Sequence, residues 1–144
     1  MTHAAQTRTT EHRTASEAET AAVGRALGRT LSAGDAVLLT GPLGAGKTAF
    51  TRGIAEGLGC DPDDVSSPTF TIVQEYGGPV RLQHVDLYRL APKEIDDLAL
   101  EDLWENSVLV VEWPDRWNRR PSDAVEVVIE PVGDTDRKIT VSRI

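Results

Sequence analysis

The sequence predicts a single-domain α/β fold with a mixed central sheet that is flanked by helices and extended by antiparallel strands. Short apolar runs typical of buried strands alternate with helical patterns along the chain. A glycine-rich loop joins one of these strands directly to a helix. The chain has 144 residues, of which 40% are hydrophobic, which suits one domain with one modest core.

The N-terminal segment shows no such pattern. Residues 1–15 lack an apolar signal core, so we expect them to be a disordered tail, with residues 16–144 forming the domain. Ser16 is a candidate N-cap, and Glu17 and Glu19 stand in the first turn of the helix that follows. Apolar residues recur on one face of this helix, which we expect to end at Gly34: they are Val23, Leu27 and Leu31.

The most informative segment is Gly41–Thr48, because GPLGAGKT matches the phosphate-loop pattern G-x-x-x-x-G-K-[ST]. The apolar strand 36–39 precedes it and a helical pattern follows, as this motif requires. Glycines let backbone N–H groups turn inward around an anion, and the helix that starts near Gly46 directs its positive dipole end there. Lys47 can reach the β- and γ-phosphates, and the Thr48 hydroxyl can bind Mg²⁺. We expect Lys47 to be exposed in the empty site.

The second half of the chain predicts more strands than helices. The expected elements are a hairpin of strands at 69–76 and 80–88, an acidic helix at 92–104, a central parallel strand at 108–111, a loop at 114–122 and closing strands at 125–132 and 138–144.

Two of these strands end in an acidic residue, Asp86 and Glu112. Ligands bind at the carboxyl ends of strands in open α/β sheets, where an acid can hold Mg²⁺ or orient an attacking water. Glu112 follows the more hydrophobic run and is the stronger metal candidate, but the sequence leaves open which acid touches the metal. His84 and Tyr88 share a strand face with Asp86; for His84, packing or hydrogen bonding is favoured over proton transfer.

Two loops have alternative interpretations. The hydroxyl-rich segment 66–69 is either a switch that senses the γ-phosphate or a plain turn before a strand. The second loop carries Trp113, Arg116 and Trp117, which are either exposed interface anchors or buried anchors of the loop.

Composition narrows the function classes. The net charge of −8 does not favour direct nucleic-acid binding. The single cysteine, Cys60, cannot form an internal disulfide, so a reducing cytoplasm is expected. No apolar run approaches the roughly 20 residues that span a membrane. The Asn-Lys-x-Asp segment of guanine-specific switches is absent from the sequence, which favours adenine.

Four motifs together resemble the TsaE family, small bacterial ATPases of tRNA threonylcarbamoyladenosine synthesis. They are GPLGAGKT at Gly41–Thr48, SPTF at Ser67–Phe70, HVDLYRL at His84–Leu90 and VEWPDR at Val111–Arg116. Their order and spacing fit from Ser16 to the C-terminus. One departure is Ala99, where relatives often have Gly, and it concerns the local turn.

The resemblance implies a P-loop NTPase fold and a role for each matched residue. ATP would be bound by Gly41, Gly44, Ala45, Gly46, Lys47, Thr48, Ala49, Arg137 and Thr20. Mg²⁺ would be held by Thr48 and Glu112. Hydrolysis and switching would involve Asp86, Glu112 and Thr69.

The resemblance also implies partners. The chain would be a monomer when alone and would bind the TsaB–TsaD pair, so that it meets tRNA only indirectly. Two other functions stay open. One is a small-molecule kinase, in which Arg116, Arg119 and Arg120 could clamp a phosphate. The other is a non-catalytic module that binds partners in a nucleotide-dependent way.

Overall fold

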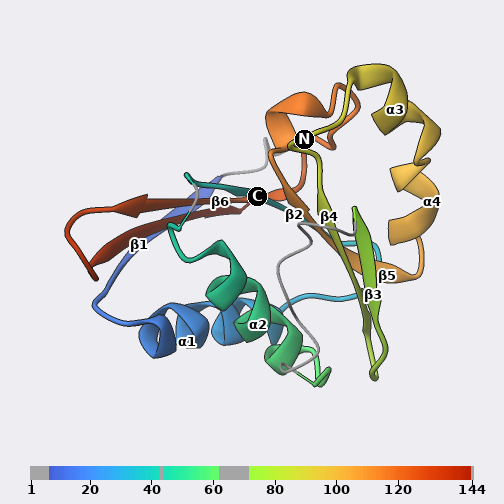
Figure 1. Cartoon of the computed structure of the whole chain (residues 1–144). Coiled ribbons are helices and arrows are strands. Elements are labelled where there is room, and N and C mark those ends of the chain that lie inside the picture. Colours follow the sequence, from blue (N-terminus) through green and yellow to red (C-terminus); the bar gives the residue numbers. More distant parts are fainter. Residues whose placement is uncertain (1–6, 43, 62–71, 144) are drawn as a thin grey trace, which may run out of the picture.

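The computed structural model describes residues 7–42, 44–61 and 72–143 (Figure 1). Within them, seven strands form one mixed sheet in the order β1-β7-β6-β2-β5-β4-β3. The strands are β1 (Arg8–Thr14), β2 (Ala36–Thr40), β3 (Val73–Tyr76), β4 (Arg81–Asp86), β5 (Ser107–Glu112), β6 (Val125–Pro131) and β7 (Arg137–Arg143). The helices are α1 (Glu17–Gly28), α2 (Lys47–Gly57), α3 (Pro92–Asp97), α4 (Leu100–Trp104) and the 3₁₀ turn η2 (Pro114–Arg116).

The centre of the sheet is parallel, and its edges are antiparallel. Strands β6, β2, β5 and β4 run parallel, whereas β3 pairs antiparallel with β4, and β7 with both β6 and β1. All six residues of β5 are buried, as expected for a central parallel strand. The predicted single-domain α/β fold with antiparallel additions is confirmed.

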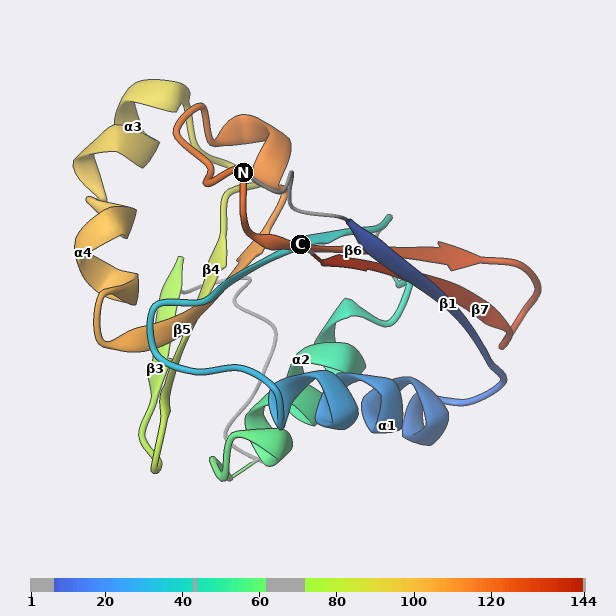
Figure 2. The same ribbon diagram turned by 180° about the vertical axis from the view of Figure 1, so that it is seen from behind.

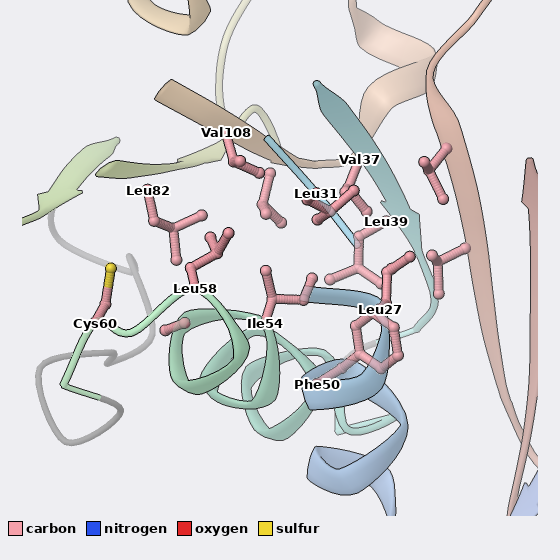
Figure 3. Packing of buried hydrophobic residues seen from close by; sticks show 14 of the residues in the cluster. Leu27, Leu31, Val37, Leu39, Phe50, Ile54, Leu58, Cys60, Leu82 and Val108 are labelled. Atoms are coloured by element: carbon pink, nitrogen blue, oxygen red, sulfur yellow. The ribbon is translucent and has the colours of Figure 1, made fainter. Parts of the chain in front are cut away.

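Helices cover both faces of this central part. Helices α1 and α2 lie side by side on one face, and α3, α4 and η2 lie on the other (Figures 1 and 2). Figure 3 shows Leu27 of α1 and Phe50 and Ile54 of α2 beside Val37 and Leu39 of β2. A second core on the opposite face includes Leu38, Val85, Leu109, Val111, Ile95, Leu100 and Trp117. In the described ranges, no helix has both the length and the apolar character needed to cross a bilayer.

The expected disordered tail is wrong for Arg8–Thr14, which forms strand β1. This strand pairs with β7 over seven residue pairs, from Arg8 opposite Arg143 to Thr14 opposite Arg137. Six of its seven residues are exposed, so it carries no hydrophobic alternation that the sequence could reveal. Backbone hydrogen bonding to β7, rather than side-chain burial, therefore accounts for its formation.

The single helix expected at 92–104 is also wrong. Two short helices, α3 and α4, meet at Ala99, which has a φ of 49°. Glycine adopts this left-handed conformation without steric cost, whereas alanine is strained in it. The break therefore falls at the position where the resemblance described above would favour a glycine.

The helices α1 and α2 approach each other unusually closely through glycines. These are Gly24 and Gly28 in α1 and Gly53 and Gly57 in α2. A Cβ atom built at Gly53 would lie 2.0 Å from the carbonyl oxygen of Ala21, and one at Gly24 would lie 2.2 Å from that of Phe50. Because the opposing atoms are backbone, no side-chain rotation can relieve such a clash. The short distance between the two helices therefore requires that these positions lack a Cβ atom.

We expect Gly53→Ala to reduce the free energy of unfolding by about 1–3 kcal/mol, since overpacking would push the helices apart. The control is Gly77→Ala, because a Cβ at Gly77 meets nothing within 4 Å. Urea unfolding of both variants checks the prediction, and equal stability of the two would contradict it.

Candidate nucleotide-phosphate site

A cavity of about 660 Å³ opens at the carboxyl ends of the central parallel strands. Besides the ends of β4 and β5, three parts of the chain enclose it: the phosphate loop with the start of α2, the first turn of α1, and the β6–β7 turn. Its lining residues include Ser16, Glu17, Thr20, Gly44, Gly46, Lys47, Thr48, Ala49, Asp86, Glu112, Trp113, Asp134, Thr135 and Arg137.

The phosphate loop presents the N-terminus of α2 to this cavity. Gly44 and Gly46 have φ values of 76° and 105°, so both need the left-handed region that glycine allows. Gly46 is the N-cap of α2 and offers no side-chain acceptor to the first N–H groups of the helix. The helix therefore begins with donors available to an anion.

Two predicted loop residues lie behind the cavity rather than along it. Ala45 is fully buried, and its N–H donates to the carbonyl of Pro42. A Cβ at Gly41 would lie 2.8 Å from the carbonyl oxygen of Ile129, so Gly41 allows the loop to lie against β6. These two residues shape the loop, while Gly44, Gly46, Lys47, Thr48 and Ala49 line the cavity.

Glu112 is the centre of a buried network of charged and polar groups. Its Oε1 lies 3.5 Å from Nζ of Lys47, and its Oε2 lies 2.6 Å from Nε2 of His84. The expectation that Lys47 is exposed is wrong, because only 6% of this residue is exposed. A buried carboxylate at the end of β5 draws the lysine inward, since an unpaired charge there would be costly.

Asp86 lies beside Glu112 in the register of β4 and β5. Its Oδ1 accepts a hydrogen bond of 2.9 Å from the N–H of Tyr88. Burial raises the pKa of Asp86 above its ordinary value, and the Tyr88 hydrogen bond offsets this only in part. Burial also acts to raise the pKa of Glu112, but the interactions with His84 and Lys47 outweigh it and hold that pKa below its ordinary value. The environments of the two acids thus separate their pKa values, as sites with distinct acid and base roles do.

An aromatic stack covers one side of the network. Nζ of Lys47 lies 4.9 Å from the ring centroid of Trp113, and the Trp113 and Tyr88 centroids are 4.8 Å apart. The Arg116 guanidinium lies 5.8 Å from the Tyr88 ring. Trp113 has a φ of 59°, a strained conformation for a bulky residue that is typical of functional sites.

Trp117 takes the buried alternative, and its interpretation as an exposed interface anchor is wrong. It is 2% exposed and meets Trp104 edge-on at a centroid distance of 5.5 Å. Trp113 and Arg116 stay candidates for contact with a partner.

Arg137 links the β6–β7 turn to the phosphate loop. Its Nε donates to the carbonyl of Ala45 at 3.0 Å and its Nη2 to that of Gly44 at 3.2 Å. Nη1 donates to carbonyls of its own turn, the shortest bond being 2.9 Å to Asp136. The Arg137 side chain therefore lines the cavity and also binds the backbone carbonyls of the phosphate loop.

Thr20 connects the cavity wall to β1. Its hydroxyl lies 2.8 Å from that of Thr14, and its methyl carbon faces the phosphate loop, 3.5 Å from a Cβ built at Gly46. The predicted switch residue Thr69 lies outside the described residues.

Sequence and structure comparisons agree with this arrangement. A profile of the family described as threonylcarbamoyl adenosine biosynthesis protein TsaE matches residues 14–139. The chain is 40% identical over 135 residues to the tRNA threonylcarbamoyladenosine biosynthesis protein TsaE of Bacillus subtilis, covering 92% of this chain and 84% of the relative. It is 42% identical over 113 residues to TsaE of a Nostoc species, covering 74% and 69%. The chain belongs to the TsaE family.

A solved structure supports the same assignment. The crystal structure of Bacillus subtilis YdiB matches with a TM-score of 0.76 and 32% identity, over 98% of this chain and 89% of that one. The fold is therefore the P-loop fold, in which the segments HVDLYRL and VEWPDR place Asp86 and Glu112 side by side at the cavity.

Sequence reasoning missed two residues of the β6–β7 turn, although the resemblance placed the nearby Arg137 at the nucleotide. Asp134 and Thr135 line the cavity and lie more than 80 residues from the phosphate loop. No local pattern marks them, and only the pairing of β6 with β2 brings their turn to the site. The arginines of the kinase alternative are placed differently: Arg116, Arg119 and Arg120 do not line the cavity.

We expect the stabilising effect of Glu112 to depend on pH. Because folding lowers its pKa, the ionised form adds stability above the unfolded pKa, and this is lost as pH falls through the folded pKa. The free-energy difference between the wild type and Glu112→Gln should therefore shrink from pH 7 to pH 3. Urea unfolding at several pH values measures it, with the exposed Glu105→Gln as control. A difference that stayed constant with pH would refute the expectation.

Proposed function

We propose that this chain is a Mg²⁺-dependent ATPase that supports tRNA threonylcarbamoyladenosine formation at adenosine 37 by acting with TsaB and TsaD in the cytoplasm. One observation carries the proposal. The uncapped N-terminus of α2, Lys47 and two carboxylates on neighbouring strands meet in one cavity. This combination of anion donors and metal-binding oxygens is what nucleoside triphosphate hydrolysis requires.

The residues present fit ATP and Mg²⁺. The cavity volume of about 660 Å³ lies within the range of small-molecule sites. Thr48, Asp86 and Glu112 offer oxygen donors, which Mg²⁺ prefers. Two carboxylates and one hydroxyl are enough, because Mg²⁺ takes its other ligands from phosphates and water.

Each residue would then have a separate task. Lys47 would exchange its partner Glu112 for phosphate oxygens, and Thr48 and Glu112 would hold Mg²⁺. The bound ion would neutralise charge on the phosphates. Asp86 would accept a proton from, or orient, the attacking water, because its raised pKa makes it a better base near neutral pH. Thr69 would act as a switch residue.

The other cavity walls would hold the rest of the nucleotide. We assign this role to Thr20 and Glu17 on α1 and to Arg137 beside the β6–β7 turn, all of which line the cavity. Adenine rather than guanine follows from the missing Asn-Lys-x-Asp segment. The kinase alternative loses support, since its three arginines lie outside the cavity.

We expect Lys47→Ala to lower ATP affinity at least tenfold, because a charge-assisted hydrogen bond to phosphate contributes about 1.5–3 kcal/mol. Asp86→Asn should keep ATP binding but slow phosphate release. Calorimetry and a phosphate-release assay measure the two effects, with the exposed Arg119→Ala as control.

Lys47→Ala also leaves Glu112 without its cation, so a second variant is needed. Thr48→Ala removes the expected metal-binding hydroxyl without breaking an ion pair. It should weaken ATP binding in the presence of Mg²⁺ but not in its absence. ATP affinity unchanged in both variants would refute the phosphate site. Binding without any hydrolysis, alone or with TsaB and TsaD, would instead support the non-catalytic module.

Partner stimulation is the second part of the proposal. The cavity mouth includes the half-exposed Tyr88 beside Trp113, so a bound partner could exclude water there. We expect slow hydrolysis alone and faster hydrolysis with TsaB–TsaD. Trp113→Ala should reduce this stimulation more than it reduces ATP binding. The control is Val132→Ala, which truncates another exposed apolar residue. Equal stimulation of the wild type and Trp113→Ala would exclude Trp113 from the coupling.

A further inference from the structure

His84 is a fully buried imidazole that the proposed reaction does not use. It lies on β4 two residues before Asp86, and its exposure is 0%. Its Nε2 lies 2.6 Å from Oε2 of Glu112. Its Nδ1 is buried and has no hydrogen-bond partner among the described residues. Glu112 is therefore the hydrogen-bond partner of this ring among the described residues.

The contact is directional. An ionised carboxylate only accepts hydrogen bonds, so Nε2 must carry the proton and donate it to Oε2. This holds whether the ring carries one proton or two. Because the other nitrogen has no partner, no competing hydrogen bond turns the ring away from Glu112.

The two oxygens of Glu112 are thus held from different directions. Oε2 is bound by His84 of the sheet, and Oε1 faces Lys47 of the phosphate loop. Lys47 would move to phosphate when a nucleotide binds, and this would release Oε1 alone. A carboxylate with one oxygen fixed presents the other in one direction, as hydrogen-bonded metal ligands do.

We propose that His84 is a positioning residue that holds Oε2 of Glu112 and so directs Oε1 toward the phosphate loop and the Mg²⁺ of the nucleotide complex. This deepens the proposed function and rests on it for the metal. The hydrogen bond between His84 and Glu112 is itself an observation of the structure and does not rest on the proposed function.

Two substitutions separate positioning from packing. His84→Gln keeps an N–H donor near the place of Nε2, whereas His84→Leu fills the space and removes the donor. Gln83→Leu is the control, because Gln83 is a buried polar residue of the same strand whose side chain points to the other face.

The experiment is a Mg²⁺ titration of ATP binding, followed by calorimetry. We expect His84→Leu to raise the Mg²⁺ concentration at half-saturation by about 10-fold or more, the usual effect of losing such a partner. ATP affinity in EDTA should stay unchanged. His84→Gln and Gln83→Leu should behave like the wild type. In a Glu112→Gln background, His84→Leu should have no further effect.

A second readout needs no nucleotide. The ¹³C resonance of the Glu112 carboxyl carbon should move in His84→Leu and stay near the wild-type position in His84→Gln. Equal impairment of His84→Leu and His84→Gln in both measurements would overturn the proposal, as would an undiminished effect in the Glu112→Gln background. If the wild type binds no ATP in either Mg²⁺ or EDTA, the proposed function fails with the metal role of His84. The carboxyl shift then still decides whether His84 holds Glu112.

Discussion

The close approach of α1 to α2 is the constraint on which the site depends. Glycines at the crossing bring the backbones so near that a methyl group at Gly53 would collide with a carbonyl oxygen. Helix α2 begins in the phosphate loop, and the first turn of α1 forms the facing wall of the cavity. The spacing of these helices therefore sets the distance between the loop and that wall. The glycine-mediated packing of α1 against α2 thus determines the shape of the cavity as well as that of the core.

The buried carboxylate of Glu112 organises the charged groups of the site. Glu112 ends the most deeply buried strand, where a carboxylate is stable only with partners. The loop supplies Lys47 and the neighbouring strand supplies His84, so one acid ties together elements that are far apart in sequence. Movement of Lys47 from Glu112 to a bound phosphate would change the charge balance of the whole cluster. Nucleotide binding and the electrostatics of the buried cluster would therefore be linked through the side chain of Lys47.

The sequence predicted what local patterns encode and missed what pairing decides. The glycine loop, the apolar run of β5 and the acids Asp86 and Glu112 were found because each has a short-range signature. Strand β1 was missed because its exposed residues show no alternation, and the turn at Asp134 because nothing local marks it. The burial of Lys47 and Trp117 depends on neighbours distant in the chain, which periodicity does not report. The break at Ala99 was missed as well, because alanine favours helix and nothing in the local pattern requires its positive φ.

Strand β1 has a consequence for the outer side of the sheet. It occupies the hydrogen-bonding edge of β7, and most of its own side chains are exposed and polar or charged. Such residues on an outermost strand discourage pairing with another chain. A chain that began at Ala15 would lack β1. It would expose the N–H and C=O groups of β7 as a template for intermolecular strand addition, and would also remove the hydroxyl of Thr14 that Thr20 contacts beside the cavity. The N-terminal strand therefore protects the edge of the sheet from pairing with another chain and supports one wall of the cavity.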